Sequence, residues 1–184
     1  MHPMSTQMPT TATHTASTTV DDEEVARFSA IAAEWWDVKG KFAPLHRLNP
    51  TRIAYLREQI IRHFSLDGQS ATPLNNLSLL DIGCGGGLTA EPMARLGATV
   101  TGADASPTNI SVADLHAKQA GLTINYRATT AEALAGIASP SPEPRAPSPQ
   151  YDVVMALEII EHVADIDLFY NAITTLVKPG GMLI

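Results

Sequence analysis

The sequence predicts an alternating α/β fold built on a mostly parallel sheet with flanking helices. Short apolar runs typical of buried parallel strands alternate with segments of helical periodicity. A glycine-rich turn follows the first of these apolar runs. The length of 184 residues, of which 45% are hydrophobic, suits one domain with a sizeable core. We therefore expect helices and strands to follow one another along most of the chain.

The first residues are expected to precede the folded part. Residues 1–20 are rich in threonine and contain no Asp, Glu, Lys or Arg, so we expect a disordered tail. Four acidic residues then run from Asp21 to Glu24. Negative charge in a first turn complements the helix dipole, and apolar residues recur on one face after it. This pattern predicts a helix over 22–36.

The segment before the sheet contains a second predicted helix. Pro44 and Pro50 make a long helix improbable over 42–50, because proline lacks an N–H group and clashes with the preceding turn. The next helix is therefore predicted over 51–64. We interpret residues 21–66 as a helical lid or substrate segment.

The remaining residues, 67–184, alternate between strand and helix patterns and are interpreted as one cofactor-binding domain. Its expected elements are a strand over 77–82, a helix over 88–96, a strand over 98–103, a helix opening at Ser106 and Pro107, a strand over 124–127, a helix over 130–137, a strand over 151–157, a helix over 166–177 and a fifth strand starting at 182.

Two features interrupt this alternation. Residues 139–150 contain five prolines and predict an exposed loop insertion, for which a solvated spacer is favoured over a recognition segment. The fifth strand begins only at residue 182, so we expect the domain to be incomplete at its C-terminal end. Such a strand would leave an unpaired apolar sheet edge.

The glycine-rich turn at 81–87 predicts a nucleoside cofactor. It reads Asp-Ile-Gly-Cys-Gly-Gly-Gly, and Asp104 at the end of the next strand follows Gly83 by 21 residues. The glycines permit a tight turn, and the Asp104 carboxylate can accept hydrogen bonds from two ribose hydroxyls. A dinucleotide frame opening at Gly83 has Leu88 where its third glycine belongs, although a frame opening at Gly85 is passable. The pattern favours S-adenosylmethionine, which has no pyrophosphate.

Composition narrows the partners and the compartment. Only 12 Lys and Arg face 19 Asp and Glu, a net charge of −7, which makes nucleic acid an unexpected partner. The single cysteine, Cys84, is interpreted as a small loop residue. No apolar run approaches the ~20 residues of a membrane span, and the N-terminus has no signal-peptide core. We expect a cytoplasmic protein, with the mitochondrial matrix as the alternative.

The chain resembles the class I S-adenosylmethionine-dependent methyltransferases, which have a Rossmann-like fold, and among them the ubiquinone-biosynthesis O-methyltransferases. The glycine turn marks only the superfamily. The specific segments lie upstream of it: Trp35-Trp36-Asp37 and the run Pro-Leu-His-Arg-Leu-Asn-Pro at 44–50. Further matching segments are 27–29, 97–104, 151–163 and 176–181.

The resemblance implies cofactor-binding roles for five residues. Gly83 is similar to the loop glycine that touches the cofactor, with Gly85 beside it, and Asp104 to the ribose-binding acid. Arg52 resembles an arginine that reaches the cofactor, and a guanidinium suits the carboxylate of the methionine portion. Leu157 stands where the family has methionine, so its backbone is expected to make that contact.

Glu158, Glu161 and His162 form a second group of chemically active side chains. On a helix, positions i, i+3 and i+4 lie together, so the three could share one metal ion. The resemblance implies magnesium here, which would bind a catechol oxygen and lower its pKa. Without a metal, these side chains would cap or solvate a helix start. His162 is also a candidate catalytic base in place of a ligand.

The resemblance implies polyprenylated catechol and demethylated ubiquinol intermediates as methyl acceptors. Because such lipids reside in the bilayer, we expect peripheral contact with the inner membrane and with other ubiquinone-biosynthesis proteins. Trp35, Trp36 and Phe42 could line an acceptor tunnel or anchor at an interface, but core packing is the commoner role. The alternatives are a cofactor-binding fragment without activity, another small-molecule methyltransferase and, more weakly, a dehydrogenase.

Overall fold

The computed structural model describes residues 19–137 and 148–184. A five-stranded sheet lies at its centre, and all four pairings between neighbouring strands are parallel. The strands are β1 (Ser78–Ile82), β2 (Thr99–Asp104), β3 (Asn125–Ala128), β4 (Tyr151–Met155) and β5 (Val177–Leu183). They are ordered β3-β2-β1-β4-β5 across the sheet. The predicted alternating α/β fold with a parallel sheet is confirmed.

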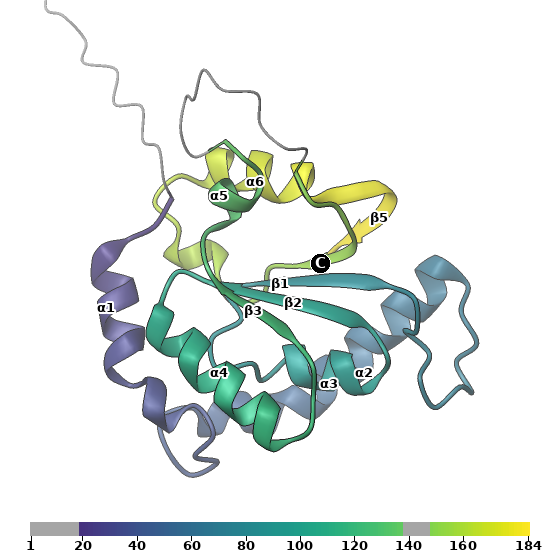
Figure 1. The fold of residues 1–184 in the computed structure, drawn as a ribbon, viewed down its shortest axis with the longest axis horizontal. Helices are drawn as coiled ribbons and strands as arrows, with labels where there is room; N and C mark the ends of the chain where they lie inside the picture. The colour runs from purple at the N-terminus through teal and green to yellow at the C-terminus, as the bar shows by residue number, and fades with distance from the viewer. Residues whose placement is uncertain (1–18, 138–147) are drawn as a thin grey trace, which may run out of the picture.

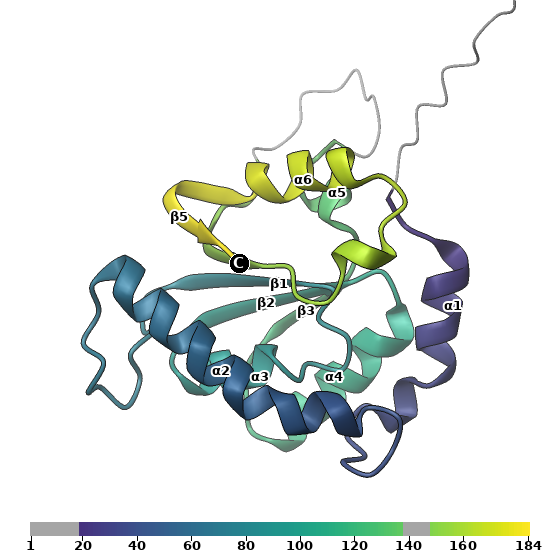
Figure 2. The same cartoon turned by 180° about the vertical axis from the view of Figure 1, so that it is seen from behind.

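Helices cover both faces of the sheet (Figures 1 and 2). One face carries α5 (Ala131–Leu134) and α6 (Ile166–Thr175), and the other carries α2 (Ala43–Phe64), α3 (Ala90–Arg95) and α4 (Pro107–Gln119). Helix α1 (Asp22–Ala30) runs beside α4. The sheet is therefore the middle layer of three.

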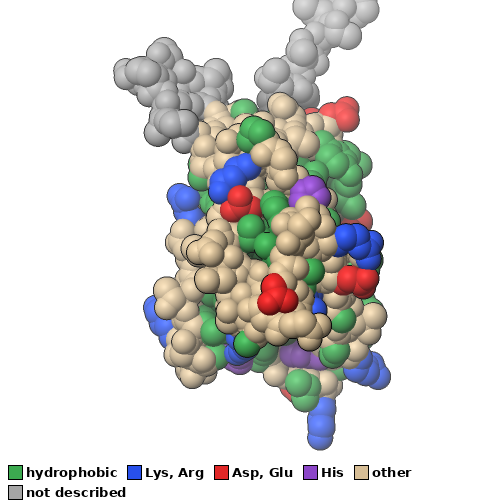
Figure 3. Space-filling view, turned by 90° about the vertical axis from the view of Figure 1, so that its right-hand side faces the viewer, with side chains coloured by type: hydrophobic (Ala, Val, Ile, Leu, Met, Phe, Trp, Pro, Cys, Tyr) green, Lys and Arg blue, Asp and Glu red, His purple; other side chains and the backbone are tan. Residues whose placement is uncertain are grey.

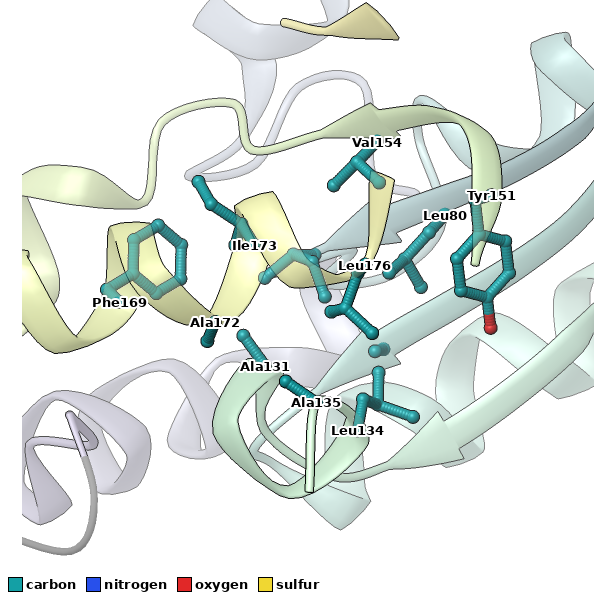
Figure 4. Close-up of a cluster of buried hydrophobic side chains, with 12 residues drawn as sticks. Leu80, Ala131, Leu134, Ala135, Tyr151, Val154, Phe169, Ala172, Ile173 and Leu176 are labelled. Carbon is teal, nitrogen blue, oxygen red and sulfur yellow. The ribbon is translucent and has the colours of Figure 1, made fainter. Parts of the chain in front are cut away.

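Side chains of the central strand β1 alternate between two cores. Leu80 points into the cluster that includes Phe169 and Ile173 of α6 (Figure 4). Its neighbour Leu79 lies in the cluster on the opposite face, with Leu56 of α2. Burial on both faces explains why β1 has a nearly continuous apolar sequence.

The helix predicted over 22–36 is shorter than expected. Asp21 caps α1 by accepting a hydrogen bond from the backbone N–H of Glu23 at 2.9 Å, which confirms the acidic helix start. The helix ends at Ala30, and a 3₁₀ turn, η1 (Ala32–Glu34), follows. This change of direction lets Trp35 stack on Phe42, with ring centroids 3.8 Å apart.

The prediction that prolines delay the second helix until residue 51 is wrong, because α2 begins at Ala43 and contains both. Pro44 lies in the first turn, where its missing N–H would have no helical partner. Pro50 lies inside the helix, where proline costs ~3 kcal/mol. Tertiary contacts offset this cost: Asn49 donates to the Leu88 carbonyl at 2.8 Å, and Leu56 is buried.

Several other boundaries differ from prediction. Helices α3 and α5 are shorter than expected at both ends, and α6 ends at Thr175 because Val177 already pairs with Tyr151 in the sheet. Strand β5 therefore starts five residues before the predicted residue 182. Its pairing with β4 shifts register between Tyr151 and Val153, which accommodates the turn-like Pro179 and Gly180.

The predicted tail and insertion lie mostly outside the described residues. Within the tail, Thr19 is only 3% exposed, contrary to the expectation for residues 1–20. Its carbonyl accepts a hydrogen bond from the Ala164 N–H at 2.9 Å, and its hydroxyl donates to Glu132. At the end of the proline-rich segment, the Ser148 hydroxyl donates to the Ala135 carbonyl at 2.7 Å.

Two further observations concern helices that could span a membrane and the distribution of surface charge. Within 19–137 and 148–184, no helix is both long enough and apolar enough to cross a bilayer. On the face shown in Figure 3, acidic and basic side chains are scattered among hydrophobic and other residues.

Candidate functional site

A cavity of ≈ 350 Å³ lies where the strands β1, β2 and β4 end. Ligands of open parallel sheets bind at this carboxyl edge, where the loops leave the strands. All the residues that the sequence analysis assigned to cofactor, metal or catalysis line it: Arg52, Gly83, Gly85, Asp104, Leu157, Glu158, Glu161 and His162.

The glycine turn adopts a backbone that side chains would disturb. Gly83 and Gly85 have φ values of 71° and 52°, in the left-handed region that favours glycine. A Cβ atom at Gly83 would lie 2.5 Å from Ile159 Cδ1, and one at Gly85 would lie 2.4 Å from the Trp35 ring. The N–H of Gly83 donates to the Ala103 carbonyl at 2.8 Å. The turn is thus fixed to β2 with its backbone beside the cavity.

Asp104 is held by three N–H donors at the end of β2. Oδ2 accepts from the Gly85 backbone at 2.9 Å, and Oδ1 accepts from the Ser106 backbone at 2.8 Å and from Asn109 Nδ2 at 3.2 Å. Burial raises the pKa of Asp104 above its usual value, and these three hydrogen bonds oppose that rise. The remaining acceptor capacity of this oriented carboxylate suits a ribose hydroxyl.

Asp81 is a cavity residue that the sequence analysis did not assign. It is 3% exposed, and its Oδ2 atom is buried without a hydrogen-bond partner. Burial, followed by the nearby charge of Asp104, raises the pKa of Asp81 to about 7, while Arg52 acts to lower it. A cationic ligand group would supply the missing partner. The available sequence signal was the position of Asp81 near the end of β1, two residues before Gly83.

Arg52 reaches the cavity from α2 and is paired there. Its Nη2 atom lies 2.8 Å from Oε1 of Glu158, and its side chain is only 14% exposed. Glu158 follows β4 with φ of 53°. The Arg52 guanidinium is therefore positioned to bind a ligand carboxylate, either in place of Glu158 or together with it.

The three candidate metal ligands do not converge. Residues 158–162 do not form an α-helix, because only the 3₁₀ turn η2 (Ile160–His162) follows the bend at Glu158, so the expected i, i+3, i+4 face is lost. Glu158 pairs with Arg52, and His162 Nδ1 lies 2.9 Å from Glu24 Oε2. Glu161 Oε1 is 3.9 Å from His162 Nε2.

Among the described residues, no group of three His, Cys, Asp or Glu side chains could hold a metal ion. The arrangement of Glu158, Glu161 and His162 therefore does not fit the magnesium site that the resemblance implies. All three side chains line the cavity, but Glu158 pairs with Arg52, whereas Glu161 and His162 lie near each other.

Two cavity residues have environments that limit their chemistry. Cys84 is buried, and burial followed by the charge of Asp81 raises the pKa of its thiol well above the usual value. This environment suits packing and disfavours a nucleophile. Leu157, directly after β4, lines the cavity and is partly buried against the core cluster of the α2 face.

The tandem tryptophans hold the outside of the glycine turn. Trp35 packs against Gly85 and Gly86 and donates from Nε1 to Asn109 Oδ1 at 3.0 Å. Trp36 donates from Nε1 to the Gly86 carbonyl at 3.0 Å and stacks on His116. Trp35 and Phe42 are buried in one core cluster and Trp36 packs against it, while Trp35 also lines the cavity.

Glu132 of α5 also lines the cavity and was not anticipated. Its side chain is fully buried, with Oε1 accepting from Thr19 and Oε2 lacking a partner. No sequence signal identified it, because the contact with Thr19 joins residues 113 positions apart.

The chain is similar in sequence to a known family and to several curated proteins. The family described as "Methyltransferase domain" matches residues 80–184, more than half of the chain. A protein of Brucella anthropi named ubiquinone biosynthesis O-methyltransferase is 57% identical over 171 residues, covering 93% of this chain and 65% of that protein. A protein of the same name from Sinorhizobium medicae is 53% identical over 169 residues, covering 92% and 64%. The chain thus spans about two thirds of the length of these curated relatives.

Solved structures share the fold. A magnesium protoporphyrin IX methyltransferase from Synechocystis with bound SAM superposes with a TM-score of 0.61 at 20% identity, covering 86% of this chain and 73% of that one. An S-adenosylmethionine-dependent methyltransferase from Clostridium acetobutylicum superposes with a TM-score of 0.56 at 14% identity, covering 86% and 55%. At these identities the likeness extends to the fold alone.

Proposed function

Because the chain belongs to the family of proteins with a methyltransferase domain, we propose that it is an S-adenosylmethionine-dependent O-methyltransferase of ubiquinone biosynthesis. The observation that carries the proposal is the pair of carboxylates, buried Asp81 and part-buried Asp104, that line one cavity beside the glycine turn. The names of the two bacterial relatives support the pathway.

The cofactor has a distinct partner for each of its polar groups. Asp104 binds the ribose hydroxyls, because its oriented carboxylate can accept their hydrogen bonds. Asp81 lies next to the glycine turn and pairs with the α-ammonium group of the methionine portion, while Arg52 binds its carboxylate. The Gly83 and Gly85 backbones allow close approach, and the Leu157 backbone contacts the cofactor from the β4 side.

The reaction transfers the methyl group from the sulfonium to a hydroxyl oxygen of the acceptor. The new O–CH₃ bond forms as the S–CH₃ bond breaks, S-adenosylhomocysteine leaves, and the acceptor proton passes to a base. Positioning of oxygen, methyl and sulfur in line supplies most of the rate, because the sulfonium is already activated.

We assign the base to His162. Its ring lies against Phe28 and lines the cavity, and its Nδ1–H can donate a hydrogen bond to Glu24 Oε2, 2.9 Å away. In this tautomer Nε2, which lies 3.9 Å from Glu161 Oε1, carries no hydrogen and can accept the acceptor's proton. Magnesium has no step in this mechanism, since Glu158, Glu161 and His162 do not fit a common ion.

The acceptor class is a catechol-type hydroxyl on a polyprenylated ring, of the kind found in 2-polyprenyl-6-hydroxyphenol and 3-demethylubiquinol. A ring with a long isoprenoid chain reaches the cavity from a lipid surface, so we include peripheral contact with the inner membrane and with other ubiquinone-biosynthesis proteins in the proposal. The names of the two bacterial relatives support an acceptor of the ubiquinone pathway.

The first test is calorimetric titration of the chain with S-adenosylhomocysteine. We expect micromolar binding that is lost in Asp104→Ala, with Asp104→Asn as a control that keeps the size of the side chain. A folded chain that does not bind would contradict the cofactor assignment. Turnover of a short-chain polyprenyl catechol, measured with and without added Mg²⁺, then tests the acceptor and the dispensability of the metal.

A further inference from the structure

A chain of two hydrogen bonds connects the N-terminal segment to the ribose-binding carboxylate. Trp35 Nε1 donates to Asn109 Oδ1 at 3.0 Å, and Asn109 Nδ2 donates to Asp104 Oδ1 at 3.2 Å. Asn109 lies in the first turn of α4 and is 2% exposed. Asp104 and Asn109 are five residues apart in the sequence, whereas Trp35 is 74 residues from Asn109.

The chemistry of the three side chains fixes the direction of this chain. An indole N–H is only a donor, so Asn109 must present its carbonyl oxygen to Trp35. The amide nitrogen then faces Asp104, where a carboxylate can only accept. Replacement of the indole N–H would free the Asn109 amide to rotate.

Trp35, at the outer end of these two hydrogen bonds, is held rigidly. Trp35 stacks on Phe42 with an interplanar angle of 10° and packs against Gly85 and Gly86 so closely that no Cβ would fit there. The inner end is reinforced by the helix cap, because Ser106 accepts from the Asn109 N–H at 3.2 Å. Asn109 is therefore held from both sides while it donates to Asp104.

We propose that Asn109 is a positioning residue for the cofactor, which holds the Asp104 carboxylate for the ribose and is itself oriented by the Trp35 indole. The inference rests on the proposed function, because it assigns a task to the same cofactor site. It makes the N-terminal segment part of the cofactor site, in addition to any role as a lid or substrate segment.

The hydrogen bond from Asn109 also favours the ionised form of Asp104. Burial raises the pKa of Asp104, and the N–H groups of Ser106, Gly85 and Asn109 oppose this rise. The titratable groups that face Asp104 are Asp81 at the end of β1 and Cys84 in the turn, with Arg52 beyond Asp81. Loss of the Asn109 donor leaves the carboxylate less well oriented and more easily protonated.

The experiment compares S-adenosylhomocysteine with its 2′-deoxy analogue by calorimetry on the wild-type chain, Asn109→Ala and Trp35→Phe. We expect Asn109→Ala to weaken S-adenosylhomocysteine binding about tenfold and Trp35→Phe, which keeps the stacked ring, about threefold, as expected for loss of one hydrogen bond to a charged group or one neutral hydrogen bond. Both losses should shrink on the deoxy analogue. The double variant should bind no more weakly than Asn109→Ala.

Two further variants separate positioning from general destabilisation. Trp36→Phe removes a matching indole hydrogen bond, to the Gly86 carbonyl, that does not lead to Asp104. This substitution should weaken the binding of both ligands equally. Asn109→Asp keeps the acceptor for Trp35 but places a second carboxylate beside Asp104, so binding should be lost at pH 8 and partly regained as the pH falls toward 5.

Equal losses on both ligands, additive effects of Trp35→Phe and Asn109→Ala, or unchanged affinity in Asn109→Ala would each overturn the inference while leaving the cofactor assignment intact. No binding of S-adenosylhomocysteine by the folded wild-type chain would overturn the proposed function and this inference together. Circular dichroism and thermal unfolding identify folded variants, and Trp35→Phe provides the decisive comparison if Asn109→Ala does not fold.

Discussion

Replacement of Asp81 by asparagine should stabilise the ligand-free protein at alkaline pH while it impairs cofactor binding. The Asp81 carboxyl is buried without a partner for Oδ2, and burial, reinforced by the charge of Asp104, raises its pKa to about 7. A carboxyl in the unfolded chain titrates near ~3.9. The folded state therefore holds this proton more tightly than the unfolded state does.

The sign and size of the effect follow from this difference. The stability that Asp81 contributes is complete below the unfolded pKa and is lost as the pH rises through about 7. The rise from 3.8 to about 7 corresponds to about 4 kcal/mol. Asparagine resembles the protonated acid at every pH, but its amide N–H₂ also needs partners. We therefore expect Asp81→Asn to exceed the wild type by about 2–4 kcal/mol at pH 8.

Urea denaturation of the wild type and Asp81→Asn from pH 5 to pH 8 measures this difference in unfolding free energy. Because all other titratable groups are the same in the two proteins, their contributions cancel in the difference. The gap should narrow steadily toward pH 5. Calorimetry in buffers of different ionisation enthalpy should show proton release when the wild-type chain binds S-adenosylhomocysteine near pH 7, and Asp81→Asn should bind at least tenfold more weakly without proton release. A pH-independent gap, or a variant less stable than wild type at pH 8, would refute the reasoning.

Three further predictions concern substitutions at the glycine turn, in α2 and at Arg52. Gly83→Ala should destabilise the chain by about 1–3 kcal/mol in thermal unfolding. Adding Ile159→Ala removes the side chain that the new Cβ would meet, so it should restore only part of the lost stability, because φ of 71° still strains an alanine at position 83. Pro50→Ala should raise the melting temperature whereas Pro44→Ala, in the first turn, should not; equal effects would contradict the assignment of Pro50 to the helix interior. Arg52→Lys should keep the positive charge beside Asp81 but weaken S-adenosylhomocysteine binding about tenfold in calorimetry, because an ammonium cannot make a bidentate contact with a carboxylate. Unchanged affinity would contradict the assignment of Arg52 to the ligand carboxylate.

The sequence predicted the sheet and the position of the cavity because both depend on local patterns. Alternation of apolar strands with helices identified all five strands, and the glycine turn with Asp104 located the carboxyl edge where the cavity lies. The error at Pro50 arose because local propensity was outweighed by packing of the rest of α2, which no nearby residue reports. The 3₁₀ break after Ala30 likewise depends on Trp35 reaching the glycine turn.

Site residues that depend on long-range contacts were predicted less well. Glu158, Glu161 and His162 were grouped on an assumed helix, and the bend at Glu158 separates them. Asp81 was visible in the motif, but its unpartnered oxygen is a property of the folded core. The link from Asn109 to the N-terminal segment could not be recognised from the sequence, because Trp35 lies 74 residues away, before the first strand.

The position of β1 in the sheet also determines when the protein can fold. Its neighbour on one side is β2, only a helix away, but on the other side it is β4, and the hydrogen bond from the Ser78 backbone to Asp152 closes a loop of 74 residues. Such non-local pairing is slow, because loop-closure entropy is lost before the contacts form. During synthesis the β1 strand must therefore wait, with one edge unpaired, until β4 has left the ribosome. Chaperone demand should be greatest in that interval, since the exposed edge of an apolar strand invites aggregation.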